Sequence, residues 1–421
     1  MNKDWIYRTN IYEVNVRQYT TEGTFNAFAE HLPRLRTMGI ETLWFMPITP
    51  ISELNKKGSL GSYYACSDYS RINPEFGTLA DFKNLVNAAK DLGFKVIIDW
   101  VANHTGWDHI WTKEHPDWYK VDAQTGGFLK ASGMDDIIEL DFTKADVRTA
   151  MINSMKFWIE QTDLDGFRCD LASWVNLEFW LEASSILNKI KPLLWLAEAD
   201  ALHHPLYMQV FDVAYTWKWM HKTEDWYKQT LPLQDLTFIM EEYTRSPGLE
   251  LWFTTNHDEN SWNGSEYEKY GEAAGMLSVH SITWPGIPLI YSGQELPNFR
   301  RLAFFEKDAI DWSAQPKLES FYQTLLKVKK DSAALDARAD VFILPNSIST
   351  KAFTFLRKSG EDEVLVFLNF SGSTIEFSLN SGWLQGTFQD VFSNEMTSIT
   401  YSSRFVLAGW QYKVYKKERT E

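Results

Sequence analysis

The chain has 421 residues, and 41 lysines and arginines against 56 aspartates and glutamates give it a formal net charge of −15. This acidic balance argues against a nucleic-acid partner and against an anionic membrane surface, because both depend on lysine and arginine for binding. The two cysteines, Cys66 and Cys169, exclude a disulfide framework and lack the CxxC spacing of a metal or redox site.

Neither a leader peptide nor a membrane span is predicted. The first eight residues contain no apolar stretch of signal-peptide length, so we expect a cytoplasmic protein. A periplasmic or secreted location is the alternative if a leader has been removed. No segment approaches the ~18 apolar residues of a membrane span, and Pro285 and Pro288 interrupt the most apolar run.

Short apolar runs alternate with amphipathic segments from residue 11 to residue 292. Most of the runs lack a period of two, which is typical of parallel strands buried on both faces. Eight strands are predicted, at residues 11–16, 42–46, 95–99, 166–170, 193–198, 211–214, 251–255 and 289–292.

The intervening segments have helical patterns. Residues 78–92 begin with Thr78 and Asp81 at capping-box spacing and are followed by Gly93, and residues 144–161 carry apolar side chains on one face. Eight strands separated by helices predict an α/β fold, a (β/α)8 TIM barrel. A doubly wound open sheet is the alternative, but no glycine-rich phosphate fingerprint follows any strand.

Helical periodicity disappears near residue 335. From Phe342 onward β-rich segments alternate with turns, which predicts a small C-terminal antiparallel β-sandwich. Its predicted strands are residues 352–357, 364–370, 374–379, 386–392 and 411–416.

Polar residues stand where the predicted barrel strands end, which is where catalytic groups lie in this architecture. They are Asp99, Asn103 and His104 after the third strand, Arg168 and Asp170 on the fourth, Glu198 on the fifth, and Asn256, His257 and Asp258 after the seventh.

Asp170 and Glu198 lie on neighbouring strands and suit retaining glycoside hydrolysis, which needs an ionised nucleophile and a protonated acid ~5–5.5 Å apart. Arg168 shares a strand face with Asp170, and we expect its charge to hold the pKa of Asp170 low. The apolar neighbours of Glu198 are expected to raise its pKa. Asp99 is expected to be a structural partner of Arg168.

Three other residues of this rim have supporting roles in this interpretation. Asp258 would hydrogen-bond sugar hydroxyls and stabilise positive charge, while His104 and His257 would donate hydrogen bonds to the same sugar ring. The 19 tryptophans fit either core packing or stacking on flat sugar faces, and we expect most of them in the core.

These stretches resemble the signature regions of the α-amylase family of glycoside hydrolases. The signature matches are residues 99–104 (DWVANH), 166–170 (GFRCD), Glu198 and 253–258 (FTTNHD), with further matches at residues 39–48, 68–78 and 291–295. The resemblance implies that Asp170 is the nucleophile, Glu198 the acid/base and Asp258 the transition-state stabiliser. It also implies that Arg168, His104 and His257 line the sugar site and that Tyr64 is its aromatic platform.

The resemblance also bears on metal binding. Many calcium-dependent members carry Lys and His at the third and fourth positions after the nucleophile, where this chain has Ser173 and Trp174. Asn103 and Glu139 occupy places where the family often has calcium ligands, but calcium takes 6–8 oxygen ligands. We therefore assign no metal ligand and expect no required cofactor, with calcium left possible. Trp174 is expected to be a platform for a neighbouring glucose unit.

Three domains follow from the strand pattern and the resemblance. We expect the barrel at residues 1–103 and 142–335, a short inserted domain B at residues 104–141, and the sandwich at residues 336–421.

The predicted function is retaining hydrolysis of α-1,4-glucosidic bonds in starch or maltodextrins, with an α-glucan oligosaccharide or polysaccharide as substrate. The alternatives are an α-glucosidase, transglycosylase or isomerase acting on small α-linked sugars, and a non-catalytic sugar-binding relative. Endo or exo action and the oligomeric state stay open.

Overall fold

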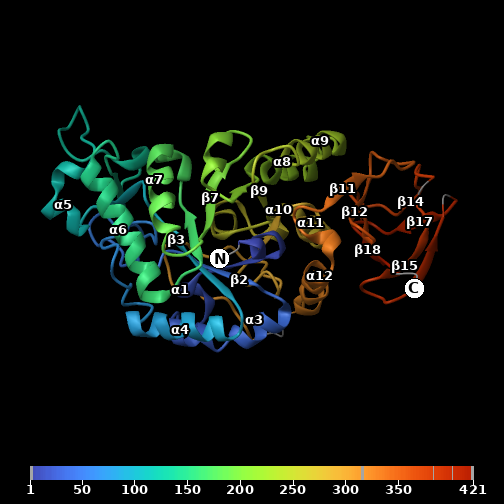
Figure 1. The fold of residues 1–421 in the computed structure, drawn as a ribbon, viewed down its shortest axis with the longest axis horizontal. Coiled ribbons are helices and arrows are strands. Elements are labelled where there is room, and N and C mark those ends of the chain that lie inside the picture. The colour runs from blue at the N-terminus through green and yellow to red at the C-terminus, as the bar shows by residue number, and fades with distance from the viewer. Residues whose placement is uncertain (1–2, 314–316, 383, 401, 419–421) are drawn as a thin grey trace.

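The computed structural model describes residues 3–313, 317–382, 384–400 and 402–418. A barrel surrounded by helices occupies most of the molecule, and antiparallel sheets containing the C-terminal strands stand at one end of it (Figure 1).

Within the described residues, eight parallel strands form a closed barrel in the order β1-β10-β9-β8-β7-β6-β3-β2. Each overlaps one of the eight predicted runs, so the predicted (β/α)8 barrel is confirmed. The strands are β1 (Ile11–Val14), β2 (Thr42–Phe45), β3 (Lys95–Trp100), β6 (Gly166–Cys169), β7 (Leu194–Asp200), β8 (Val213–Tyr215), β9 (Leu249–Trp252) and β10 (Ile287–Tyr291).

Helices cover the outside of the barrel, and their ends follow local sequence signals. In α4 (Leu79–Asp91), Thr78 Oγ1 accepts from the amide of Asp81 and Asp81 Oδ2 accepts from the amide of Thr78, which completes the predicted capping box. The other helices of the barrel are α1 (Val16–Tyr19), α2 (Phe25–Ala29), α3 (Leu32–Met38), α6 (Ala145–Thr162), α7 (Leu177–Leu187), α8 (Trp217–Tyr227), α9 (Leu233–Tyr243), α10 (Glu266–Tyr270), α11 (Ala274–Thr283) and α12 (Glu319–Asp331).

The core between the strands and helices is rich in aromatic side chains, because tryptophan buries a large apolar area. Fully buried tryptophans occur on both strands and helices, which agrees with the expectation that this residue type serves mainly in packing. They include Trp44, Trp100, Trp158, Trp180, Trp195, Trp219, Trp252 and Trp284.

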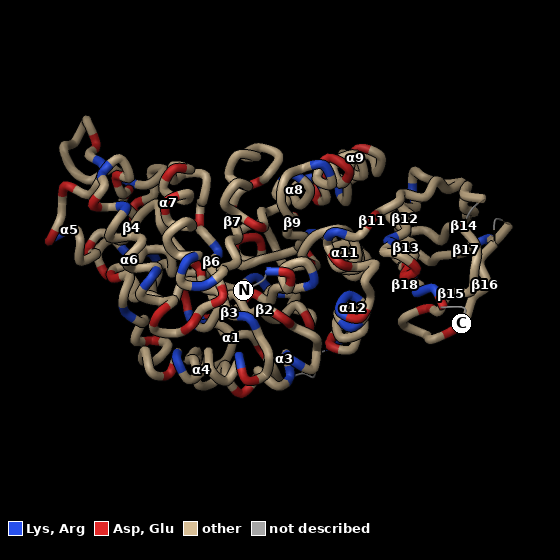
Figure 2. Tube along the Cα trace, viewed as in Figure 1, with Lys and Arg blue, Asp and Glu red and all other residues tan. Residues whose placement is uncertain are grey.

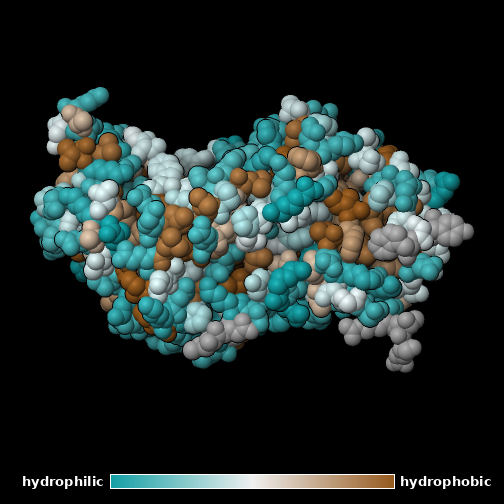
Figure 3. All heavy atoms as spheres, turned by 45° about the horizontal axis from the view of Figure 1, so that its top comes forward, coloured by the Kyte–Doolittle hydropathy of each residue, from teal (hydrophilic) through white to brown (hydrophobic). Residues whose placement is uncertain are grey.

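A short segment between β3 and β6 projects from the barrel at the end of the molecule away from the C-terminal sheets (Figures 1 and 3). It contains the antiparallel pair β4 (His104–Gly106) and β5 (Ile137–Glu139), with α5 (Ile110–Glu114) between them. The amide of Gly106 donates to the carbonyl of Cys66, so the segment is tied to the loop that follows β2.

In the part of the chain that the structure describes, the C-terminal region has a six-stranded antiparallel sheet and a two-stranded one. Phe367 of the first contacts Phe377 and Phe405 of the second at ring distances of 5.4 and 4.6 Å, which closes the predicted sandwich. The strands are β11 (Asp340–Ile343), β12 (Ala352–Ser359), β13 (Asp362–Asn369), β18 (Tyr412–Lys417), β15 (Gly386–Asp390) and β16 (Met396–Ile399), and separately β14 (Ile375–Ser378) and β17 (Arg404–Leu407).

A buried arginine joins this sandwich to the barrel. Arg357 of β12 is fully buried and donates to the carbonyls of Thr283, at the end of α11, and Asp336. Trp284 packs beside it against Phe355, with 5.0 Å between the rings.

No helix among the described residues has the length and apolar character needed to cross a membrane. Acidic and basic residues intermingle along the chain in the view of Figure 2, and hydrophilic side chains cover much of the face in Figure 3.

Candidate active site

Side chains from the carboxyl ends of several barrel strands meet at a cavity of about 520 Å³. Five of the predicted site residues line it: Tyr64, His104, Asp170, Glu198 and Asp258. The rest of the lining comes from the segments that connect the barrel strands, namely Lys57, Ser62, Met134, Asp136, Ile137, Leu171, Trp262, Phe304 and Phe305.

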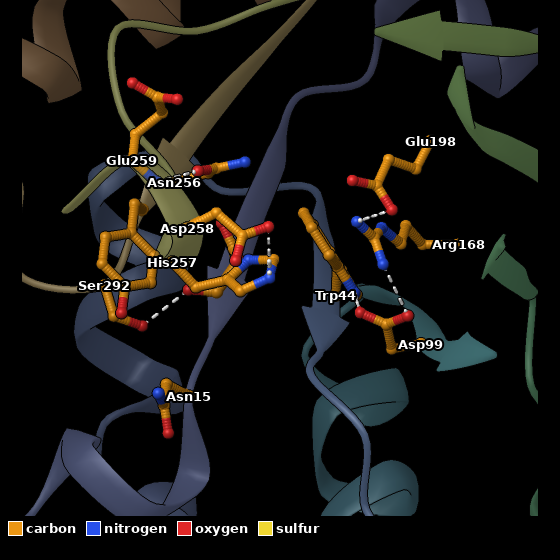
Figure 4. A network of polar contacts seen from close by, with 12 residues as sticks. Asn15, Trp44, Asp99, Arg168, Glu198, Asn256, His257, Asp258, Glu259 and Ser292 are labelled. Atoms are coloured by element: carbon orange, nitrogen blue, oxygen red, sulfur yellow. Dashed lines mark hydrogen bonds and ion pairs between the residues drawn. The ribbon is translucent and has the colours of Figure 1, made fainter. Parts of the chain in front are cut away.

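Arg168 lies fully buried under the cavity and contacts three carboxylates. Figure 4 shows two of these contacts, with Asp99 and Glu198. The Nη1 of Arg168 donates to Asp99 Oδ1 and to Asp170 Oδ1, both at 2.9 Å, and its Nη2 pairs with Glu198 Oε2 at 3.0 Å. The guanidinium also lies 5.0 Å from the centre of the Trp44 ring. One cation therefore holds Asp170 and Glu198 side by side, and Asp99 is a structural partner of Arg168 as expected.

Burial sets the protonation of the two central carboxyls. It raises the pKa of Glu198 to about 7, against the effect of Arg168 and with a contribution from the negative charge of Asp170. The predicted low pKa of Asp170 is wrong: burial raises it to about 6, because desolvation and the charge of Asp99 outweigh the attraction of Arg168. The sequence placed Arg168 beside Asp170, but it did not reveal that three carboxylates pair with this arginine.

Both ring nitrogens of His257 face carboxylates, and Figure 4 shows the contact with Asp258. Nδ1 donates to Glu13 Oε1 at 2.5 Å, while Nε2 lies 3.2 Å from Asp258 Oδ2 and 2.7 Å from the hydroxyl of Tyr64. Burial opposes the charged ring, but Asp258 and Glu13 raise the pKa of His257 well above its usual value. Although burial disfavours its ionised form, the pKa of Asp258 is lowered, chiefly by the charge of His257.

Glu13 is a site residue that the sequence reasoning missed. It lies on β1 and is fully buried. A carboxylate in the middle of an apolar strand was the available signal, since buried charges are found paired. Its contact with His257 makes it a positioning residue, because it reaches the cavity only through the imidazole ring.

Glu13→Gln is expected to lower the pKa of His257, because it removes one of the two negative charges that favour the protonated ring. Glutamine keeps an oxygen that accepts from Nδ1 but removes the negative charge. NMR titration of protein with labelled histidine measures this shift directly. Glu13→Asp, which restores the charge, is the control, and an unchanged His257 titration in Glu13→Gln would contradict the assignment.

His104 and Tyr64 lie at the cavity as expected. Burial lowers the pKa of His104 to about 4, so the ring is neutral at pH 7, and its Nε2 has no hydrogen-bond partner among the described residues. It is therefore available to a sugar hydroxyl. The Tyr64 hydroxyl donates to Asp99 Oδ2 at 3.1 Å, which fixes the ring against the cavity.

Trp174 does not join this group. It ends the short 3-10 helix Ala172–Trp174, its side chain is 43% exposed, and it is not part of the cavity lining. Its role as a platform for a neighbouring glucose unit stays a prediction.

The two candidate calcium ligands, Asn103 and Glu139, have partners within the protein. Glu139 pairs with Lys120 Nζ at 2.8 Å, and the carbonyl of Asn103 accepts from the amide of Leu140. Among the described residues, no three histidine, cysteine, aspartate or glutamate side chains form a group that could hold a metal ion. The expectation that no metal is required stays a prediction.

The sequence reasoning also missed the loop residues of the cavity. Trp262 follows Asp258, Phe304 and Phe305 follow β10, and Lys57 and Asp136 come from two further loops. None of them ends an apolar run, so strand-end reasoning could not select them.

Comparison with known proteins places this geometry in a family. The model of the alpha amylase catalytic domain matches residues 6–120 and 115–334. Alpha-amylase MalA of Haloarcula japonica is 27% identical over 401 residues, covering 90% of this chain and 58% of that protein. Alpha-amylase 3 of Dictyoglomus thermophilum is 28% identical, covering 70% and 65%. The chain thus spans less than two thirds of the length of these two relatives.

Solved structures match over nearly the whole chain. The noncanonic maltogenic alpha-amylase AmyB from Thermotoga neapolitana superposes with a TM-score of 0.90 at 27% identity, covering 99% of this chain and 100% of that one. An alpha-amylase from Lactobacillus plantarum gives a TM-score of 0.88, also at 27% identity and with the same coverage. The family match, the barrel and the carboxylates at its rim lead to one conclusion: this chain belongs to the alpha-amylase family.

Proposed function

We propose that the protein is a retaining glycoside hydrolase that cleaves α-1,4-glucosidic bonds in starch or maltodextrins. The observation that carries the proposal is the pair Asp170 and Glu198, held on the two terminal nitrogens of Arg168 at the floor of a cavity. Retaining enzymes need two carboxyl groups ~5–5.5 Å apart, and the shared guanidinium brings these two together. Relatives named alpha-amylase support the choice of substrate.

In the first step, Glu198 donates its proton to the glycosidic oxygen while Asp170 attacks the anomeric carbon. The raised pKa of Glu198, about 7, keeps a proton available near neutral pH. The C–O bond breaks, the shortened sugar leaves with the proton, and a glucosyl ester forms on Asp170.

In the second step, Glu198 takes a proton from water, and the water oxygen attacks the same carbon and releases Asp170. Positive charge develops on the sugar ring in both steps. Asp258 stays ionised because His257 lowers its pKa, so it can stabilise that charge. The proposed reaction uses side chains of this chain alone.

The proposal predicts that maltoheptaose and soluble starch release reducing sugar whose first anomer is α, detected by proton NMR. EDTA in a parallel assay is expected to leave the rate unchanged, since no metal enters the proposed steps. A first product in the β form would rule out retention. Turnover of trehalose, sucrose or isomaltose but not of maltoheptaose would favour an enzyme of small α-linked sugars, and binding without turnover would favour a sugar-binding protein.

A further inference from the structure

Three loops are bonded to one another along one side of the cavity. In the loop after β2, the amide of Leu60 donates to the carbonyl of Phe305 at 3.1 Å, and the amide of Ser59 donates to Glu306 Oε1 at 2.9 Å. Two residues before Ser59 in the same loop, Lys57 Nζ pairs with Asp136 Oδ1 of the inserted segment at 2.7 Å. We call residues 57–60, 134–137 and 304–306 the cavity wall.

Close packing holds the cavity wall together. The Asp136 side chain is only 6% exposed, and the partly exposed Lys57 side chain reaches in to pair with it. Gly58 has a φ of +62°, and a Cβ there would lie 2.5 Å from Cβ of Phe305. Glycine therefore lets the first loop turn sharply and lie directly against the third.

The cavity wall stands on the side of Tyr64 and His257. The Phe304 ring is stacked at 17° on Tyr64, with 6.2 Å between centroids, and lies 6.2 Å from the His257 ring. Glu198 lies on the other side, next to Arg168 and away from His257 (Figure 4), and it accepts from the amide of Leu171 at 2.9 Å.

The position of Glu198 sets the orientation of the glucan chain in the cavity. This step rests on the proposed function, in which Glu198 is the acid. Glu198 protonates the leaving oxygen, so the sugar units that leave extend past Glu198. The anomeric carbon of the reacting glucose lies between Asp170 and Glu198. The opposite edge of this glucose ring carries the bond toward the non-reducing end of the chain. That edge then points toward Tyr64 and the cavity wall.

We propose that the cavity wall ends the substrate site on its non-reducing side, so that the enzyme acts in the exo mode and removes short units of one length from chain ends. A glucan that continues beyond the cavity would meet Lys57, Asp136 and Phe305. Such a clash prevents an internal segment of a glucan from binding across the cavity, while the non-reducing end of a chain keeps all of its contacts. Trp262, half exposed and 5.6 Å from the Phe305 ring, offers an apolar face to the last sugar held there.

Two substrates test this in the wild-type protein. Maltoheptaose with a label at its reducing end should give a single labelled product in the first turnovers. The same sugar with a 4,6-O-benzylidene group on its non-reducing end should be cleaved roughly 10–200-fold less efficiently, the discrimination that a small misfitting group produces. Equal kcat/KM for the two, or a spread of first products, overturns the exo assignment while leaving hydrolysis itself proven. No cleavage of either sugar refutes the proposed function.

Variants of the cavity wall locate the barrier. Lys57→Ala and Asp136→Asn are expected to raise kcat/KM on the benzylidene-blocked maltoheptaose relative to the unblocked sugar. They are also expected to broaden the distribution of product lengths. Lys56→Ala is the matched control, because Lys56 is on the same loop but pairs with Glu53 outside the cavity lining. If Lys57→Ala and Lys56→Ala give the same ratio as wild type, the pair does not form the barrier and the inference fails.

Discussion

Asp170→Asn is expected to lower kcat/KM on maltoheptaose by roughly 10⁴-fold or more, because loss of a covalent nucleophile removes the reaction path. Asparagine has the same shape but cannot form the glucosyl ester. The fold should persist, since burial disfavours the charged form of this carboxyl and its pKa is raised to about 6. Release of reducing sugar measures the rate, and the midpoint of thermal unfolding, Tm, measures the fold.

Asp163→Asn is the matched control for this substitution. Asp163 follows α6 and precedes β6, at the amino ends of the barrel strands, where it pairs with Lys90 and Lys191. Its loss is expected to leave kcat/KM unchanged. An Asp170→Asn protein with the activity of Asp163→Asn would refute the role of Asp170 as nucleophile.

Glu198→Ala is expected to slow maltoheptaose hydrolysis by roughly 10²–10⁴-fold, the usual contribution of general acid–base catalysis. Formation of the glucosyl ester from α-maltosyl fluoride should be far less affected, because fluoride leaves without a proton. Single-turnover release of fluoride measures this step. Asp170→Asn should be slow on both substrates, so the pair of variants separates acid from nucleophile.

The same substitution should change the pH profile. In the wild type, kcat/KM on maltoheptaose falls as pH rises through about 7, because Glu198 loses the proton it must donate, and falls below about 6 as Asp170 becomes protonated. Glu198→Ala removes the group responsible for the alkaline limb, and the acid limb should remain. An alkaline limb that persists unchanged in the variant would assign it to another group.

The barrel could be predicted because its strands are continuous apolar runs and because turns and caps such as Thr78 with Asp81 are local signals. The carboxylates could be selected because strand ends converge in this architecture. The protonation of Asp170 could not be predicted, since it depends on burial and on how Arg168 divides its charge among three partners. Local sequence shows neither quantity.

The remaining cavity residues depend on how loops meet in space. Lys57 and Asp136 lie far apart in the chain, and no periodicity connects them.

Trp174 illustrates the reverse case, a residue close in sequence to the nucleophile that does not line the cavity. It is close in sequence to Asp170, but Leu171 takes a left-handed conformation with φ of +43°, and the turn that follows leaves the indole outside the cavity lining. Proximity in sequence was therefore a poor guide to the lining of the cavity.

Arg357 joins the two parts of the chain in a way that affects how the whole molecule melts. Its buried guanidinium satisfies carbonyls at the end of α11 and at Asp336, and burial lowers its pKa to about 9. If the sandwich separated from the barrel, these carbonyls and Trp284 would lose their partners at the same moment. We therefore expect the barrel and the sandwich to unfold in one cooperative transition.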